Sequence, residues 1–175
     1  MIGFGSSASE EHLTRRVIVG VGDMAVSDDS STTFSAYALG SCVGVVAYDA
    51  ERKIGGILHV MLPDSAIYQE KALVQPSIFA DTGVDRFLAE LRELGADTTQ
   101  LRIVLAGGAS TMSSNDAFKI GEKNVIAVRA KLEASGLSPV AEELGGFTNR
   151  SLHFDLNRGR LQVGLPDQNM EVDLS

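Results

Sequence analysis

The chain has 175 residues, 44% of them hydrophobic and 22% charged, which is ordinary for a soluble globular protein and excludes a disordered chain. Its formal net charge of −8 argues against nucleic acid or an anionic membrane as the main partner, since either would bind a basic surface. One cysteine cannot form an internal disulfide bond, and three dispersed histidines argue against a zinc cluster. No apolar run suits a signal peptide or a membrane span, so we expect a cytoplasmic protein.

Short apolar runs dominate the N-terminal half and predict four strands, at residues 16–22, 33–39, 43–49 and 54–62. Residues 1–15 are rich in Gly, Ser and Glu, and they are expected to form a flexible tail that leaves His12 in solvent. The polar residues 23–32 predict a loop. The last two strands flank a polar turn and are typical of a β-hairpin, after which residues 66–77 predict an irregular connection.

The C-terminal half begins with a predicted helix that starts near Asp81, whose carboxylate can cap it, and ends at Gly95. Its apolar stripe consists of Val84, Phe87, Leu88, Leu91 and Leu94. A second helix, ended by Gly136, is marked by Ile120, Asn124, Val125, Val128 and Leu132. Further strands are predicted at residues 101–106, 140–144, 151–156 and 160–165, and the last two form a hairpin. Residues 166–175 are expected to form a polar tail.

About two main helices among many strands, with hairpins toward both ends, predict an α/β protein of the layered α/β (α+β) sandwich type, with mixed, hairpin-rich sheets. No internal repeat or linker divides the chain, so we expect a single domain over residues 16–165. The Gly107-Gly108-Ala109-Ser110 segment lacks the spacing of a nucleotide-binding loop and predicts a tight turn near the site instead.

Cys42 is the only cysteine, and it lies beside one arm of the first predicted hairpin, with His59 in the other arm. A thiolate is a nucleophile and an imidazole can deprotonate the thiol, so this pair is the minimum set for thiol catalysis. Because side chains alternate along a strand, pairing of Cys42 with His59 or Met61 puts both on one face, whereas pairing with Val60 separates them. The alternative is that both are ordinary core residues.

The two residues before the cysteine are also candidates for the site. Gly40 allows a tight approach of the backbone, so the amide hydrogens of Gly40, Ser41 and Cys42 can bind a developing oxyanion. His153, by contrast, occupies the polar phase of its predicted strand and is expected to be exposed rather than catalytic.

Five stretches in order along the chain resemble the CheD family of chemoreceptor glutamine deamidases: Leu39-Gly40-Ser41-Cys42-Val43, Gly56-Ile57-Leu58-His59-Val60-Met61-Leu62-Pro63, Ala80-Asp81-Thr82, Ala106-Gly107-Gly108-Ala109-Ser110 and Ile120-Gly121-Glu122-Lys123-Asn124. The resemblance runs from about residue 17 to residue 165. It implies an α/β sandwich similar to the catalytic domain of cytotoxic necrotizing factor toxins, and a protein-glutamine glutaminase activity on the helices of chemoreceptors. In some organisms it also implies binding of the phosphatase CheC.

The resemblance places the family's catalytic cysteine at Cys42 and its histidine at His59, and it implies no metal or organic cofactor. The family also uses a threonine six residues before the cysteine, and Ala36 occupies that position here. Ala36 cannot orient an imidazole, Ser35 would face the other side of its strand, and Thr33 is too far along. A backbone carbonyl or another polar group must therefore orient His59, or the activity is reduced.

The implied reaction is attack on a glutamine side-chain amide by Cys42, deprotonated by His59, followed by hydrolysis of a thioester, and it calls for an accessible thiolate of modest pKa. One alternative is an adaptor that binds CheC or receptors and retains Cys42 as a vestige, which Ala36 favours. Another is a different thiol hydrolase or an acyltransferase with the same pair. The loops at residues 66–79 and 110–118 are the candidates for substrate contact.

Overall fold

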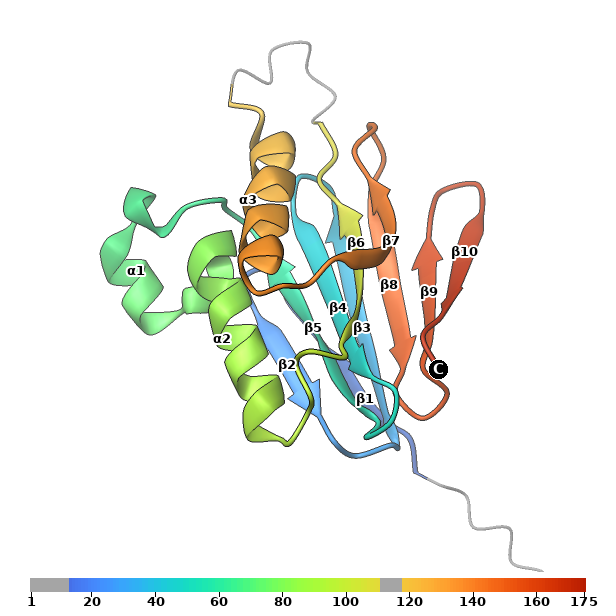
Figure 1. Ribbon diagram of the computed structural model, residues 1–175. Helices are drawn as coiled ribbons and strands as arrows, with labels where there is room; N and C mark the ends of the chain where they lie inside the picture. The colour runs from blue at the N-terminus through green and yellow to red at the C-terminus, as the bar shows by residue number, and fades with distance from the viewer. Residues whose placement is uncertain (1–12, 111–117) are drawn as a thin grey trace, which may run out of the picture.

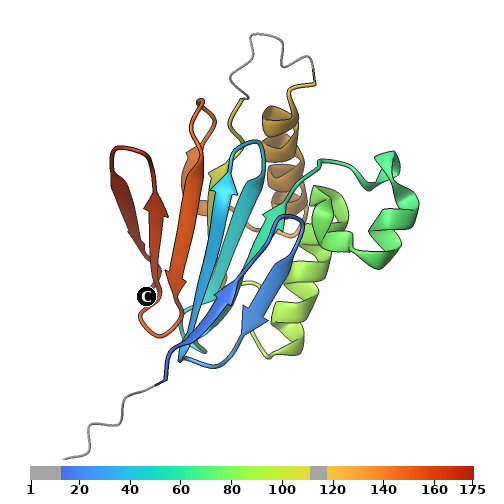
Figure 2. The same cartoon turned by 180° about the vertical axis from the view of Figure 1, so that it is seen from behind.

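Two five-stranded β-sheets lie face to face in the computed structural model, which describes residues 13–110 and 118–175 (Figure 1). The sheet that we call the covered sheet has the strand order β2-β5-β4-β6-β7, formed by Met24–Ser27, Ile54–Val60, Val43–Asp49, Arg102–Gly107 and Pro139–Leu144. The second, the open sheet, has the order β1-β3-β8-β9-β10, formed by Arg15–Ile18, Thr32–Leu39, Arg150–Asp155, Arg160–Gly164 and Asn169–Asp173. Helices lie on the outer side of the covered sheet, whereas Figure 2 shows the outer face of the open sheet without a helix. The predicted layered sandwich with mixed sheets is therefore confirmed.

The hairpin of β4 and β5 lies inside the covered sheet, between β2 and β6, and every residue of both strands is buried. Its sequence shows no alternation of apolar and polar residues because both faces of these strands are covered. Val43 and Val45 pack toward the helices, whereas Val46 and Tyr48 pack toward the open sheet. The predicted hairpin is confirmed, and it separates a helix-side core from an inter-sheet core.

Helices α2 (Ala80–Glu93) and α3 (Ile120–Ala134) cover the outer side of the covered sheet (Figure 1). The predicted stripes are confirmed, since both helices bury them in the helix-side core: Val84, Phe87, Leu88 and Leu91 on α2, and Val125, Val128 and Leu132 on α3. Gly95 follows α2 with a φ of +101°, a conformation that glycine adopts without a steric penalty. Within the described residues, no helix combines the length and apolar character that a membrane span requires.

Three segments expected to be irregular contain regular structure. Strand β2 forms inside residues 23–32, where backbone pairing with β5 at the sheet edge outweighs the polar sequence around it. The connection at residues 66–77 contains the short helix α1 (Gln69–Val74), flanked by the 3₁₀ turns Ser65–Ile67 and Pro76–Ile78. The expected polar tail at residues 166–175 contains β10, which pairs with β9 and is followed by the fully buried Leu174.

Two smaller expectations also differ from the structure. Asp81 does not cap α2, because its carboxylate accepts hydrogen bonds from the backbone N–H and the hydroxyl of Ser65, at 3.0 and 2.6 Å. The first strand ends at Ile18 rather than at residue 22, since Gly22 turns the chain with a φ of +76°. His12 lies outside the described residues.

Candidate active site

Cys42 immediately precedes β4, and His59 lies near the end of the neighbouring strand β5. The register pairs Val43 with Val60 and Gly44 with His59, which brings Cys42 level with Met61. This is one of the two registers that put Cys42 and His59 on one face, as diagonal neighbours. That face looks toward the open sheet, where Cys42 is half-buried against the inter-sheet core. Gly44, directly opposite His59, contributes no side chain to the space between them.

His59 is fully buried and is held by the loop that follows β1. The N–H of Gly22 donates to the carbonyl of His59 at 2.9 Å, and the N–H of His59 donates to the carbonyl of Asp23 at 2.9 Å. The ring nitrogen Nδ1 lies 3.4 Å from the carbonyl oxygen of Val19. Because a carbonyl can only accept, Nδ1 carries the proton and the lone pair of the neutral ring lies on Nε2.

Nε2 of His59 is buried and has no hydrogen-bond partner among the described residues, so the Cys42 thiol does not donate to it in this structure. Burial lowers the pKa of His59, although the Val19 carbonyl and the charge of Asp23 oppose the shift. Burial raises the pKa of the Cys42 thiol, which its own backbone N–H lowers in part. Both shifts favour a neutral thiol beside a neutral imidazole. This environment therefore opposes the expected thiolate of modest pKa, and His59 presents an unprotonated Nε2.

The segment that follows β6 holds the backbone on both sides of Ser41. The N–H of Ala109 donates to the carbonyl of Gly40 at 2.8 Å, and the N–H of Gly108 donates to the carbonyl of Cys42 at 2.8 Å. Gly107 makes this approach possible, because a Cβ atom at that position would lie 2.1 Å from the Cys42 carbonyl oxygen. The expected tight turn is not observed, since residues 108–110 form no turn, but the segment lies next to Cys42 as predicted. Its backbone amides bind protein rather than a phosphate.

Asn124, in the first turns of α3, holds the remaining carbonyl of this segment. Its Nδ2 group donates to the carbonyl of Ser41 at 2.9 Å and to the carbonyl of Met61 at 3.0 Å. The side chain therefore links the segment before β4 to the segment after β5, which are the two segments that position Cys42 and His59. Sequence reasoning placed Asn124 in a helix stripe and in a CheD-like stretch, but assigned it no role in the site. The signal was its polarity, because a buried polar residue in an apolar stripe must have partners.

The amide hydrogens near Cys42 differ in their availability. The N–H of Gly40 donates to the carbonyl of Ala38 at 2.9 Å, in a turn where Ala38 has a φ of +57°, so the expectation that Gly40 serves an oxyanion is wrong. The N–H groups of Ser41 and Cys42 donate to no other residue of the described chain. These two are the donors that an oxyanion at Cys42 could use.

Comparisons with known sequences identify the family of this chain. The family described as "CheD chemotactic sensory transduction" matches residues 61–164. A protein from Pyrococcus abyssi is 39% identical over 86% of this chain and 92% of its own length, and one from Solibacter usitatus is 38% identical over 83% and 86%. Both are named "probable chemoreceptor glutamine deamidase CheD", as is a relative from Thermococcus kodakarensis at 37% identity. The chain belongs to the CheD family.

The match to the CheD family model starts after Cys42 and His59, but the alignments with individual CheD relatives extend further. A continuous alignment over 86% of a 175-residue chain leaves end regions too short to reach position 42 or 59 from either terminus. Both residues therefore lie inside the region of similarity.

The side chain of Ala36, which occupies the position of the threonine implied by the family resemblance, cannot form a hydrogen bond with His59. Ala36 is fully buried in the inter-sheet core and pairs with Leu152. Ser35 points outward from the open sheet, as expected, and its Oγ lies 2.9 Å from Nδ1 of the half-buried His153. The Val19 carbonyl is the group that orients His59 in this CheD-family chain. A backbone group of this kind cannot be identified from residue types, because every residue carries one.

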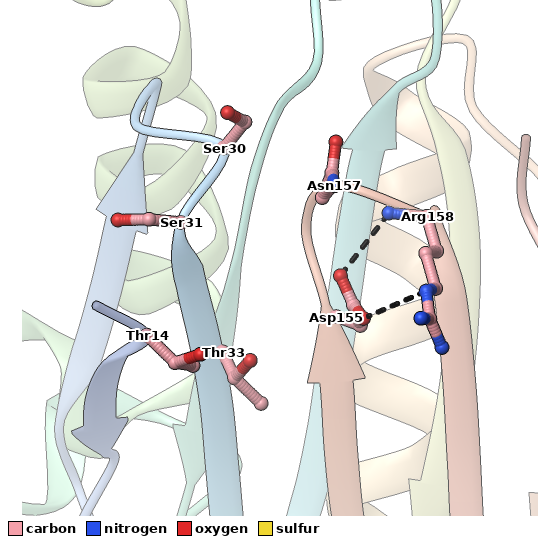
Figure 3. Close-up of a pocket in the computed structure, with 7 residues that line it drawn as sticks. All are labelled: Thr14, Ser30, Ser31, Thr33, Asp155, Asn157 and Arg158. Carbon is pink, nitrogen blue, oxygen red and sulfur yellow. Dashed lines mark hydrogen bonds and ion pairs between the residues drawn. The ribbon is translucent and has the colours of Figure 1, made fainter. Parts of the chain in front are cut away.

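Several cavities lie outside this site, among them a polar cavity and a groove beside α3. Figure 3 shows a polar cavity of about 270 Å³ at the beginning of β3, whereas Cys42 follows the end of that strand. The Asp155 carboxylate that lines it is already paired with the backbone N–H and the guanidinium of Arg158. A groove of about 620 Å³ lies beside α3 and is lined partly by Ile67 and Ile126. Within the described chain, no group of three or more His, Cys, Asp or Glu residues could hold a metal ion.

Proposed function

We propose that this CheD-family chain is a protein-glutamine deamidase that converts glutamine side chains of chemoreceptors to glutamate through a thioester on Cys42. The relatives' names supply the reaction and the kind of substrate. The observation that carries the assignment to this site is Nε2 of His59, a buried lone pair without a partner in the described chain. It lies on the same strand face as a half-exposed thiol.

In the first half of the reaction, Sγ of Cys42 forms a bond to the amide carbon while Nε2 of His59 takes the thiol proton. The carbonyl oxygen gains negative charge beside the free amide hydrogens of Ser41 and Cys42. His59 then passes its proton to the amide nitrogen and the C–N bond breaks. Ammonia departs, and a thioester remains on Cys42. The Val19 carbonyl stabilises the transient imidazolium through Nδ1–H.

In the second half, His59 takes a proton from water as the water oxygen attacks the thioester carbon. The C–S bond breaks, the proton returns to sulfur, and glutamate is released. Each proton that His59 takes is returned within the same half-reaction, so the resting neutral pair is restored. Water as the acyl acceptor separates a deamidase from an acyltransferase, in which an amine would attack the same thioester.

Mass spectrometry of a chemoreceptor cytoplasmic fragment tests the proposal directly. The fragment is incubated with the native protein, Cys42→Ala, His59→Gln and the matched control His153→Gln, which changes a histidine outside the site. We expect an amide-to-acid mass change at defined glutamines with the native protein and His153→Gln. We expect none with Cys42→Ala, and a rate roughly 10²- to 10⁴-fold lower with His59→Gln.

Two results would replace the proposal with one of its alternatives. Receptor or CheC binding without deamidation by any form would identify an adaptor. Amine incorporation at the same glutamines would identify an acyltransferase. We further propose that the protein acts in the cytoplasm, where the receptor helices that carry the glutamines lie, and that a CheC-type phosphatase is a partner. A pull-down of purified CheC with the native protein tests that last point.

A further inference from the structure

The hydrogen bonds of Asn124 fix the backbone next to the Cys42 thiol. The side chain is fully buried, and its Nδ2 group donates to the carbonyl oxygens of Ser41 and Met61. Its Oδ1 atom is buried and has no hydrogen-bond partner among the described residues. Leaving a buried polar atom unpaired destabilises a fold, so packing alone would favour an apolar residue here.

The bond to Ser41 fixes the direction of one particular amide hydrogen. The carbonyl of Ser41 and the N–H of Cys42 belong to the same peptide unit, and the described chain contains no cis peptide bond. In a trans peptide the C=O and the N–H point in opposite directions. Asn124 therefore directs the N–H of Cys42 away from α3. Because the carbonyl of Gly40 is bound by Ala109, the N–H of Ser41 is fixed in the same way.

The N–H of Cys42 also lies beside the sulfur. It is close enough to the thiol to lower its pKa in part, against the larger effect of burial. It has no other partner within the described residues. A fixed, unpaired amide hydrogen next to a nucleophilic sulfur is the arrangement that stabilises an oxyanion formed on the attacked carbon.

We propose that Asn124 is a positioning residue for the deamidation reaction, which holds the Ser41–Cys42 peptide so that the Cys42 amide hydrogen can bind the oxyanion. Asn124 does not touch the substrate. It acts through the backbone, at both tetrahedral intermediates. This inference deepens the proposed function and rests on it.

The test compares Asn124→Asp with Val128→Ala. The aspartate keeps the size of the side chain but lacks the N–H donors, whereas Val128→Ala removes a fully buried side chain from the same helix without touching the Ser41 carbonyl. For Asn124→Asp we expect kcat for deamidation to fall roughly 10- to 100-fold with KM nearly unchanged. The limiting rate of Cys42 alkylation by iodoacetamide at high pH, where the thiol is fully ionised, should stay within about threefold, because a thiolate is alkylated without an oxyanion site. Val128→Ala should lower Tm and keep kcat.

A second readout does not depend on deamidation. Cys42 adds reversibly to the carbonyl carbon of ¹³C-labelled butanal, so that the S–H bond breaks, a C–S bond forms and the aldehyde oxygen takes the proton. The oxygen of this adduct occupies the oxyanion position, so Asn124→Asp should weaken adduct formation roughly tenfold relative to the native protein and Val128→Ala. An unchanged kcat and adduct constant would overturn the inference. A parallel fall in the limiting alkylation rate at high pH would also overturn it, since Asn124 would then only support the thiol. If the native protein forms the adduct but deamidates no receptor, the proposed function fails. The dissociation constants of the adduct in the native protein and in Asn124→Asp still decide the role of Asn124.

Discussion

At the scale of single residues, burial acts in opposite directions on the pKa values of the two candidate catalytic groups, Cys42 and His59. It raises the pKa of the Cys42 thiol and lowers the pKa of His59, so both shifts move the pair away from a thiolate–imidazolium ion pair. A neutral imidazole whose Nδ1–H is fixed by the Val19 carbonyl presents its lone pair at Nε2. In the proposed mechanism, His59 is therefore a general base beside a neutral thiol, and proton transfer accompanies attack rather than preceding it.

This arrangement predicts the pH dependence of two different rates. His59 is active when unprotonated and its pKa is lowered, so kcat/KM should rise with pH along an acid limb whose midpoint lies below about 6.5, the ordinary histidine value. Alkylation of Cys42 by iodoacetamide should rise along a limb whose midpoint lies above that of free cysteine. His59→Gln should leave the alkylation limb in place. An alkylation rate that stays high at acidic pH, and that His59→Gln abolishes, would instead indicate an ion pair.

At the scale of elements, the site depends on how closely the end of β6 approaches the start of β4. Gly107 has a φ of +109°, and a Cβ atom there would lie 2.1 Å from the carbonyl oxygen of Cys42. Gly107→Ala must therefore displace the backbone of Cys42, the proposed nucleophile. Gly136→Ala is a matched control, because its φ is +73° but no atom lies within 4 Å of the added Cβ.

We expect Gly136→Ala to destabilise the fold by about 1–2 kcal/mol, the cost of the left-handed conformation, with full deamidase activity. Gly107→Ala should lower the free energy of unfolding further and reduce kcat well below that of the control. Urea unfolding and initial deamidation rates of the two variants measure both effects. Equal losses for the two variants would show that the close approach at Gly107 is not required.

The elements also show which parts of the fold a single sequence can predict. Burial leaves a pattern of residue types, so the sequence predicted the apolar faces of α2 and α3 and the continuous apolar sequence of β4. Strand β2 and helix α1 were missed, since an edge strand and a short helix depend on pairing or packing with distant segments. Cys42 and His59 were predicted as candidates from their chemistry. The Val19 carbonyl and the free amides of Ser41 and Cys42 could not be, because a backbone group has no signature in the sequence.

At the scale of the whole molecule, the C-terminal residues complete the inter-sheet core at the end away from Cys42. Leu174 is fully buried in that core, and its N–H donates to the carbonyl of Gly159 at 2.7 Å, in the turn between β8 and β9. Figure 1 places the C-terminus near this turn, whereas β8 begins beside Leu39 at the other end of the sandwich. The segment expected to be a tail is therefore part of the packed structure.

Leu174→Ala should therefore separate stability from activity. Removing a fully buried leucine side chain leaves a cavity and lowers the free energy of unfolding by about 2–5 kcal/mol. The same change at Leu73, which is 86% exposed, should alter it by no more than about 0.5 kcal/mol. Well below the melting temperature, Leu174→Ala should deamidate at the native rate, because the altered contacts lie at the end of the core away from the thiol.

Urea unfolding and deamidation rates of both variants provide the comparison. A native unfolding free energy for Leu174→Ala would mean that the last residues are a tail after all, and a lost kcat with intact folding would mean that packing at the two ends of the core is coupled.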